Sequence, residues 1–180
     1  MLTIPNALTL LRFLGIPLFV SLGLNRHADG WAILVLMIGG ATDYFDGKLA
    51  RALGQESKLG EILDPTIDRL YILATLIVLY MRDAIPLWLI LTLIIRDAVL
   101  ALATIALTIK KKPPLKVTFI GKAATFNLLY AFPFLLLALS DSTAGRVAFI
   151  FGWAFAIWGV ALYVATGVSY FLTALKTIRV

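Results

Sequence analysis

The chain has 180 residues, of which 61% are hydrophobic and 14% charged, whereas a soluble domain is about 45–50% apolar and about 25% charged, so a soluble enzyme is excluded. With no cysteine and a single histidine, the chain cannot form disulfides, cysteine-ligated metal sites or histidine clusters. The net charge of +6 indicates basic loops beside anionic lipid head groups, and it does not indicate nucleic-acid binding, because no soluble basic face is available.

The apolar segments predict six membrane-spanning helices in one all-α integral membrane domain over residues 1–180. In chain order these segments are Phe13–Asn25, Trp31–Leu53, Leu59–Met81, Ile85–Ile109, Ala123–Ser140 and Val147–Leu175. The N-terminus lacks the basic stretch and the small-residue cleavage site of a signal peptide, so we expect the first span to be retained. The second, third and fourth segments contain charged residues, which are costly in lipid and need an explanation.

The distribution of basic residues predicts the orientation of these helices. Both termini fall on one side of the membrane, and most Lys and Arg residues between the spans fall in the loops and tail of that side. The loops of the other side carry Arg26, Arg82 and Arg146. Because cytoplasmic loops are enriched in Lys and Arg, we expect both termini to face the cytoplasm. Trp31 and Trp88 would then lie at the outer interface, where aromatic residues are enriched.

Four aspartates lie inside the second and third segments, near their cytoplasmic ends. Asp43 and Asp46 are three residues apart, and Asp64 and Asp68 are four apart, so each pair shares one face of its helix. The short connection at Gly54–Lys58 lets these two faces meet. An unpaired acid at the centre of a span costs ~2.5–3.5 kcal/mol, so a neutralising partner is required. Carboxylate oxygens without His or Cys suit Mg²⁺, Mn²⁺ or Ca²⁺, and the pattern predicts a metal site there.

Small and basic residues lie in phase with these aspartates. Gly47, Ala50 and Gly60 leave room for a ligand to approach the helix backbone. Arg51 and Arg69 could hold anionic phosphate oxygens. Any one of these residues also has a purely structural interpretation, since glycine on a membrane helix usually allows close helix packing. The combination on two adjacent helices favours a ligand site.

The same residues form a recognisable motif. The stretch from Asp43 to Arg51, followed after eight residues by Gly60, Asp64 and Asp68 at four-residue spacing, resembles the signature of the CDP-alcohol phosphatidyltransferase family. The resemblance implies transfer of a phosphatidyl group from CDP-diacylglycerol to an alcohol, release of CMP, and dependence on two divalent ions, Mg²⁺ or Mn²⁺. It also implies a bacterial cell membrane location, most like actinobacterial members, with the site facing the cytoplasm.

The resemblance further implies a role for each motif residue. All four aspartates would be metal ligands, and Asp68 would also be the base that takes the proton of the acceptor hydroxyl. Gly47, Ala50, Arg51 and Gly60 would contact the CDP group. Two metal ions could clamp the oxygens of an in-line phosphoryl displacement, so the implied chemistry is physically consistent with an all-carboxylate site.

The acceptor alcohol is predicted from residues outside this motif. Pro5–Arg12 with Pro17 resembles the opening of the branches that form phosphatidylglycerophosphate and cardiolipin. Arg96-Asp97 resembles the pair that the cardiolipin-forming branch tends to carry in its fourth helix. This resemblance implies phosphatidylglycerol as acceptor, with glycerol 3-phosphate as the alternative. The candidate acceptor- or phosphate-binding residues are Asn6, Thr9, Arg12, Arg69, Arg96 and Lys122. Two alternatives stay open: Arg12 could extend to the inner membrane surface, and Arg96-Asp97 could be a purely structural pair.

Two other classes of protein are alternatives to such an enzyme. An ion or proton transporter could use intramembrane carboxylates as a relay, but the chain has no internal repeat of the kind typical of secondary transporters. A structural membrane protein could use Gly152, Gly159 and Gly167 for close packing. That glycine stripe is compatible with catalysis, and a homodimer is one arrangement it predicts.

Overall fold

The computed structural model describes the backbone of residues 4–53, 58–115 and 118–179, and the side chains of residues 9–42, 66–115 and 118–178. Within these ranges the chain forms α-helices only: α1 (Ile4–Leu24), α2 (Asp29–Leu53), α3 (Lys58–Met81), α4 (Leu87–Ile109), α5 (Phe119–Leu137) and α6 (Thr143–Arg179). The prediction of an all-α chain with six helices is therefore confirmed.

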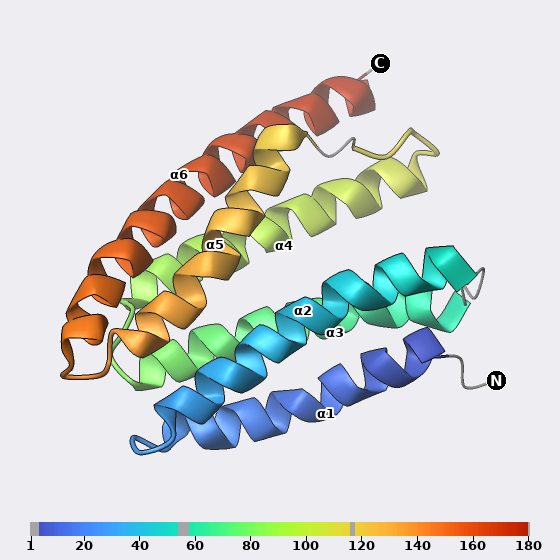
Figure 1. The fold of residues 1–180 in the computed structure, drawn as a ribbon. Coiled ribbons are helices and arrows are strands. Elements are labelled where there is room, and N and C mark those ends of the chain that lie inside the picture. Colours follow the sequence, from blue (N-terminus) through green and yellow to red (C-terminus); the bar gives the residue numbers. More distant parts are fainter. Residues whose placement is uncertain (1–3, 54–57, 116–117, 180) are drawn as a thin grey trace.

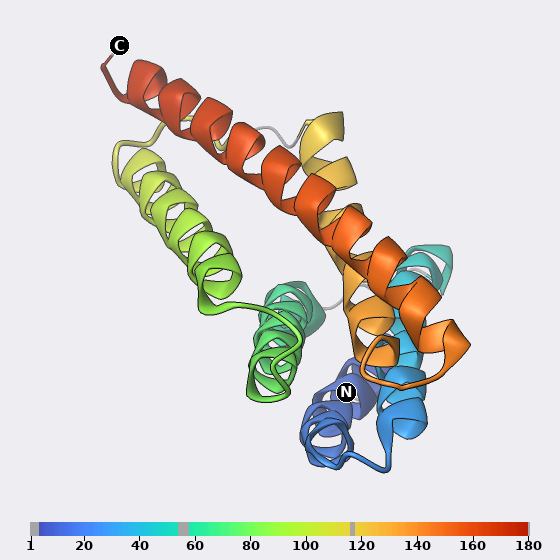
Figure 2. The same ribbon diagram turned by 90° about the vertical axis from the view of Figure 1, so that its left-hand side faces the viewer.

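The helices form two groups, α1–α3 and α4–α6, which lie one below the other in Figure 1 (Figures 1 and 2). In one group α1 packs against both α2 and α3, and in the other α6 packs extensively against α5 and also against α4. Contacts of α5 with α2 and α3 join the groups. Both termini lie at the right-hand end of Figure 1, with the end of α2 and the start of α3. This arrangement is compatible with the predicted topology, while the orientation relative to a membrane stays a prediction.

Two helices are much longer than the apolar segments that predicted them. α1 begins at Ile4, well before Phe13, and a helix accepts Pro5 there because the first turn has no internal partner for its backbone nitrogen. α6 continues to Arg179. Its last turns gain a packing surface, because Ala174 joins a small second core with Ala103 and Leu107 of α4.

The main core draws buried side chains from all six helices, and Tyr71 of α3 lies at the junction of the first group. Its ring packs against Phe19 of α1 at a centroid distance of 5.8 Å, and its hydroxyl donates a hydrogen bond to the carbonyl of Val35 in α2 at 3.1 Å. A Cβ on Gly39 would lie 2.9 Å from this ring. Glycine at that position therefore allows α2 to approach α3 around Tyr71.

The predicted glycine stripe of α6 packs inside the chain itself. A Cβ on Gly152 or Gly159 would lie 3.1 or 2.9 Å from leucine side chains of α5. A Cβ on Gly167 would lie 2.8 Å from Cγ of Arg96 in α4. Close packing is thus confirmed with α5 and α4 as the partners, and the homodimer stays a prediction.

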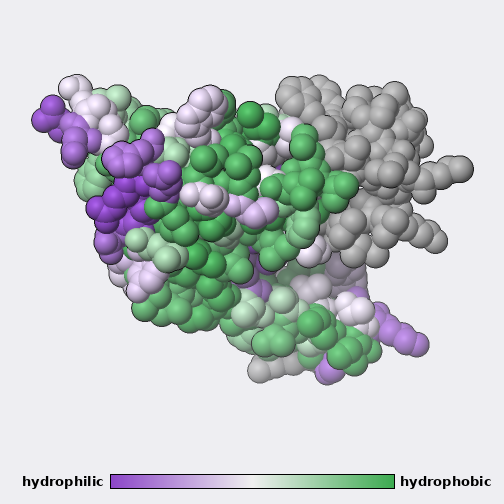
Figure 3. All heavy atoms as spheres, turned by 90° about the horizontal axis from the view of Figure 1, so that it is seen from below, coloured by the Kyte–Doolittle hydropathy of each residue, from purple (hydrophilic) through white to green (hydrophobic). Residues whose placement is uncertain are grey.

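The exterior of the helices is largely apolar. Among the described residues, α4, α5 and Thr143–Ile178 of α6 are long and apolar enough to cross a bilayer, while Thr9–Leu24 and Asp29–Thr42 are shorter apolar stretches. Large hydrophobic side chains such as Trp158 (66%) are exposed along the helices. Figure 3 shows apolar side chains covering the middle of one face and polar ones gathering at its left end. An exposed apolar surface of this extent is expected for a membrane-embedded protein, because there it faces lipid and not water.

A buried ion pair ties three helices together at the end opposite the chain termini. Arg82 donates from Nη1 and Nη2 to the two carboxylate oxygens of Asp29 at 2.7 and 3.1 Å, and from Nη1 to the carbonyl of Gly23 at 2.7 Å. The two side chains are 9% and 19% exposed. A bidentate pair of this kind fixes the ends of α1, α2 and α3 relative to one another.

We expect an Arg82→Ala variant to lose on the order of 3 kcal/mol of stability, because Asp29 would keep a largely buried charge without its partner. The matched control is Arg26→Ala, since Arg26 lies exposed in the neighbouring connection. Denaturant titration of both variants in mixed micelles measures the difference. Equal stability losses in the two variants would show that the Arg82–Asp29 pair contributes nothing specific.

Candidate functional site

A buried ion pair between α1 and α3 includes Asp68, one of the four aspartates of the predicted acidic site. Arg12 is 4% exposed, and its Nη1 donates to Oδ1 of Asp68. The Asp68 side chain is 40% exposed, so its carboxylate contacts a buried cation and still has an accessible side. Thr9, 3% exposed, lies one turn before Arg12. Extension of Arg12 to the membrane surface, one of the two alternatives, is therefore wrong, because pairing with Asp68 holds its side chain inside.

A second cluster of charges joins α3, α4 and α6. Asp97 of α4 accepts hydrogen bonds from Nη1 of Arg69 at 3.0 Å, from Nη1 of Arg96 at 3.0 Å and from the hydroxyl of Tyr163 at 2.6 Å. The guanidinium of Arg96 also lies over the Tyr163 ring, 3.8 Å from its centroid. A cation so close to an aromatic face is attracted by the ring electrons. Arg96 and Asp97 thus pair with each other, and Asp97 is shared by two arginines.

The two clusters are neighbours along α3, because Asp68 and Arg69 are consecutive residues of that helix. Together the described ion pairs link α1, α3 and α4, and the Tyr163 hydroxyl adds α6. Three of the predicted acceptor-side residues, Arg12, Arg69 and Arg96, are members of these two clusters. The clusters place the candidate base and the candidate acceptor-binding cations in one layer of the protein.

Tyr163 and Tyr170 were missed by the sequence reasoning. They are seven residues apart on α6, which puts them on the same face of the helix. The Cζ atom of Arg96 lies 6.0 Å from the Tyr170 ring centroid. Two tyrosines at this spacing on an otherwise apolar helix are the signal that could have pointed to a buried cation.

Tyr170 also holds the start of α5, where Lys122 is found. Its hydroxyl accepts from the backbone nitrogen of Thr118 at 2.7 Å and lies 2.9 Å from the Thr118 hydroxyl. Thr118 caps α5 by accepting from the nitrogen of Gly121 at 3.2 Å. A Cβ on Gly121 would lie 2.4 Å from the Tyr170 oxygen, so this close approach requires glycine. Lys122 follows directly and its side chain is exposed.

The other predicted site residues fall outside the described side chains. Their helices are placed, since positions 43–53 belong to α2 and 58–65 to α3. Of the side chains that the structure does describe, no three His, Cys, Asp or Glu residues gather into a metal-binding group. The predicted residues concerned are Asn6, Asp43, Asp46, Gly47, Ala50, Arg51, Gly60 and Asp64. The metal site and the CDP contacts therefore stay predictions.

Comparison with known proteins decides the family. The family model of the CDP-alcohol phosphatidyltransferases matches residues 2–164 of the chain. The chain belongs to this family. As a CDP-alcohol phosphatidyltransferase it is a transferase, and its activity implies CDP-diacylglycerol and an alcohol acceptor as substrates. This membership gives no support to the transporter alternative.

Several CDP-alcohol phosphatidyltransferases are similar to the chain over nearly its full length. It is 49% identical over 183 residues to the CMP-forming cardiolipin synthase of Streptomyces coelicolor, covering 99% of the chain and 85% of that protein. It is 42% identical over 178 residues to a putative cardiolipin synthase of Mycobacterium tuberculosis, with coverages of 99% and 85%. A probable phosphatidylglycerophosphate synthase of the same species is 32% identical over 180 residues, with coverages of 96% and 82%.

We expect an Asp97→Asn variant of this CDP-alcohol phosphatidyltransferase to lose roughly 10–100-fold in kcat/KM for the acceptor, because Arg69 and Arg96 lose the charge that orients them. Asp83→Asn is the matched control, since Asp83 is exposed in the α3–α4 connection. Steady-state kinetics with the acceptor varied measures the effect. Unchanged kcat/KM in Asp97→Asn would mean that the cluster around Asp97 is only structural.

Proposed function

We propose that the protein is a CMP-forming cardiolipin synthase, which transfers the phosphatidyl group of CDP-diacylglycerol to phosphatidylglycerol and releases CMP. The observation that carries this proposal is the graded similarity to named relatives. Identity over 99% of the chain is 49% to a CMP-forming cardiolipin synthase and 42% to a putative cardiolipin synthase. It is 32% over 96% of the chain to a probable phosphatidylglycerophosphate synthase. The bacterial cell membrane, with the site facing the cytoplasm, is the location that we propose with this activity.

In the proposed reaction Asp68 is the general base. Its carboxylate takes the proton of the acceptor hydroxyl, and the hydroxyl oxygen forms a bond to the phosphorus of the phosphatidyl group. The bond from that phosphorus to the bridging oxygen of the diphosphate breaks, and this oxygen leaves with CMP. The accessible side of Asp68 suits this role, and the buried Arg12 supplies the counter-charge that an intramembrane carboxylate needs.

We propose Mg²⁺ or Mn²⁺ as cofactor, held as two ions by Asp43, Asp46, Asp64 and Asp68. The donor set fits these ions because it consists of carboxylate oxygens alone. When bound, such ions would neutralise the charge of the diphosphate and of the phosphate oxygen that leaves with CMP. The proposed contacts of the CDP group are Gly47, Ala50, Arg51 and Gly60.

The acceptor side is assigned to the basic and polar residues around the two clusters. Arg69 and Arg96 lie on either side of Asp97, and Lys122 stands at the start of α5 beside the Thr118–Tyr170 contact. Asn6, Thr9 and Arg12 are the further acceptor- or phosphate-binding residues that we propose. A homodimer stays part of the proposal as well.

A two-acceptor assay tests the proposed function. The purified protein is incubated with CDP-diacylglycerol and Mg²⁺ or Mn²⁺, and phosphatidylglycerol and glycerol 3-phosphate are offered in separate tubes. We expect CMP and cardiolipin only in the tube with phosphatidylglycerol. Phosphatidylglycerophosphate formed from glycerol 3-phosphate would refute the assignment of phosphatidylglycerol as the acceptor. If neither tube releases CMP, both acceptors are refuted.

A further inference from the structure

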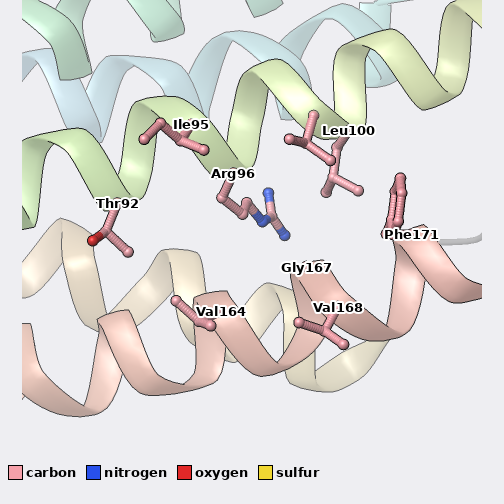
Figure 4. Close-up of a pocket in the computed structure, with 9 residues that line it drawn as sticks. Thr92, Ile95, Arg96, Leu100, Val164, Gly167, Val168 and Phe171 are labelled. Carbon is pink, nitrogen blue, oxygen red and sulfur yellow. The ribbon is translucent and has the colours of Figure 1, made fainter.

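A pocket of about 370 Å³ opens between α4 and α6. Figure 4 shows Ile95 and Arg96 of α4 facing Val164, Gly167 and Val168 of α6. The volume lies at the lower end of the range of about 300–1,000 Å³ that is typical of ligand pockets. Of the described residues that line the pocket, Arg96 is the only charged one, and the walls are otherwise mostly hydrophobic.

The pocket opens toward the surface where lipid is expected. Ile95 is 58% and Val168 54% exposed, so the walls continue into the outer faces of α4 and α6. Both helices are long and apolar enough to cross a bilayer. A ligand that reaches this pocket from the side therefore comes from the hydrocarbon layer, and its chemistry must match that layer.

The arginine of the pocket has one unmade hydrogen bond. Arg96 Nη1 is bound to Asp97, but its Nε is buried and has no hydrogen-bond partner among the described residues. Arg69 and Arg96 share one carboxylate, Asp97, so this cluster of described residues has one cation in excess. A buried cation and an unmade hydrogen bond both favour an anionic ligand with acceptor oxygens.

We propose that this pocket binds the lipid acceptor, with one acyl chain between α4 and α6 and the phosphodiester at Arg96. The inference rests on the proposed function, because it takes phosphatidylglycerol as the acceptor. A phosphodiester carries one negative charge and matches the single excess cation. Glycerol 3-phosphate is a soluble dianion and gains nothing from apolar walls that open to lipid.

Hydrogen bonds connect this pocket to α3, the helix of the candidate base. Asp97 bridges Arg96 to Arg69 through hydrogen bonds of 3.0 Å each, and Arg69 follows Asp68 in α3. In phosphatidylglycerol the free primary hydroxyl lies three carbons beyond the phosphodiester oxygen. In the proposed arrangement a phosphate at Arg96 leaves that hydroxyl free to extend toward α3, the helix that carries Asp68. Gly167 of α6 faces Arg96 and leaves room for its side chain, because a Cβ at Gly167 would lie 2.8 Å from Arg96 Cγ.

A pair of matched tryptophan variants tests the pocket. Val168→Trp fills it, while Val147→Trp places the same bulk at another exposed valine of α6; the two valines are 54% and 48% exposed. We expect Val168→Trp to raise the KM for phosphatidylglycerol about tenfold and leave the KM for CDP-diacylglycerol unchanged, because steric filling of a site weakens binding of its own ligand. Val147→Trp should change neither. Ile95→Trp fills the pocket from α4 and should repeat the first result.

Direct binding separates failure of the pocket from failure of the proposed function. Native mass spectrometry of the purified variants measures retained phosphatidylglycerol, with diacylglycerol as the probe that lacks the phosphate. Unchanged retention and unchanged KM in both pocket variants would overturn the pocket and leave the proposed function standing. Equal retention of diacylglycerol by the unmodified protein would overturn the role of Arg96. A third outcome is that only the pocket variants lose phosphatidylglycerol while the unmodified protein forms no cardiolipin. This outcome would support the pocket and refute the proposed function.

Discussion

Replacing Asp68 with Asn is expected to lower kcat for phosphatidyl transfer by roughly 10²–10⁴-fold, the usual contribution of a positioned general base. Asparagine keeps the shape of the side chain but cannot take the proton of the acceptor hydroxyl. The measurement is CMP release at saturating substrates. Full activity in Asp68→Asn would refute its assignment as the base.

The Arg12–Asp68 ion pair gives Asp68→Asn an effect on stability as well as on activity. A double variant separates the two effects. Asp68→Asn leaves Arg12, whose side chain is 2% exposed, without that carboxylate, so some loss of stability is expected beside the loss of activity. Arg12→Gln combined with Asp68→Asn removes both charges of the pair and should recover part of the stability but none of the activity. Asp141→Asn is the control, since Asp141 is exposed between α5 and α6. Recovery of activity with stability would make the role of Asp68 structural.

Removing divalent ions is expected to abolish transfer, with a loss of at least about 10³-fold in rate, because a diphosphate and several carboxylates cannot be held together without cations. Chelation with EDTA followed by addition of Mg²⁺ or Mn²⁺ measures this, and either ion should restore CMP release. Asp43→Asn should require a higher concentration of the ion to reach half of its maximal rate. Full activity after complete chelation would refute the metal-dependent mechanism.

An unfolding measurement provides the control for chelation. If EDTA only removes a catalytic ion, the unfolding transition in detergent persists and activity returns when the ion is added back. Irreversible loss together with unfolding would mean that the ion is structural. His27 lies exposed in the α1–α2 connection and Asp83 in the α3–α4 connection. Both connections are at the end of the molecule opposite the chain termini (Figure 1), so substitution there should leave the metal requirement unchanged.

The helices could be predicted because lipid imposes a simple rule on the sequence. A span must be apolar and long enough, and its backbone must satisfy its own hydrogen bonds, so apolar runs with short breaks predict helices directly. The start of α1 was missed because Arg12 interrupts the apolar run. A charge inside a span is compatible with a helix once a partner such as Asp68 is available, and that partner is distant in sequence.

The candidate site was predictable only in its local part. Four aspartates in phase on two helices, and the motif around them, are visible in the sequence because their spacing follows the helical period. The sharing of Asp97 by Arg69, Arg96 and Tyr163 depends on how α3, α4 and α6 are packed, which no local pattern records. Arg96 and Asp97 are consecutive helix residues whose Cα–Cβ bonds point about 100° apart, yet their side chains pair with each other.

The most direct test of the central claim follows the phosphatidyl group itself. CDP-diacylglycerol with deuterated acyl chains is incubated with unlabelled phosphatidylglycerol and the protein, and the mass of the lipid product is measured. We predict cardiolipin in which one phosphatidyl group is deuterated and the other is not, with one CMP released for each cardiolipin. Unlabelled cardiolipin would show that two phosphatidylglycerol molecules condense without the nucleotide lipid, and deuterium confined to a product other than cardiolipin would show another acceptor; either result would contradict a CMP-forming cardiolipin synthase.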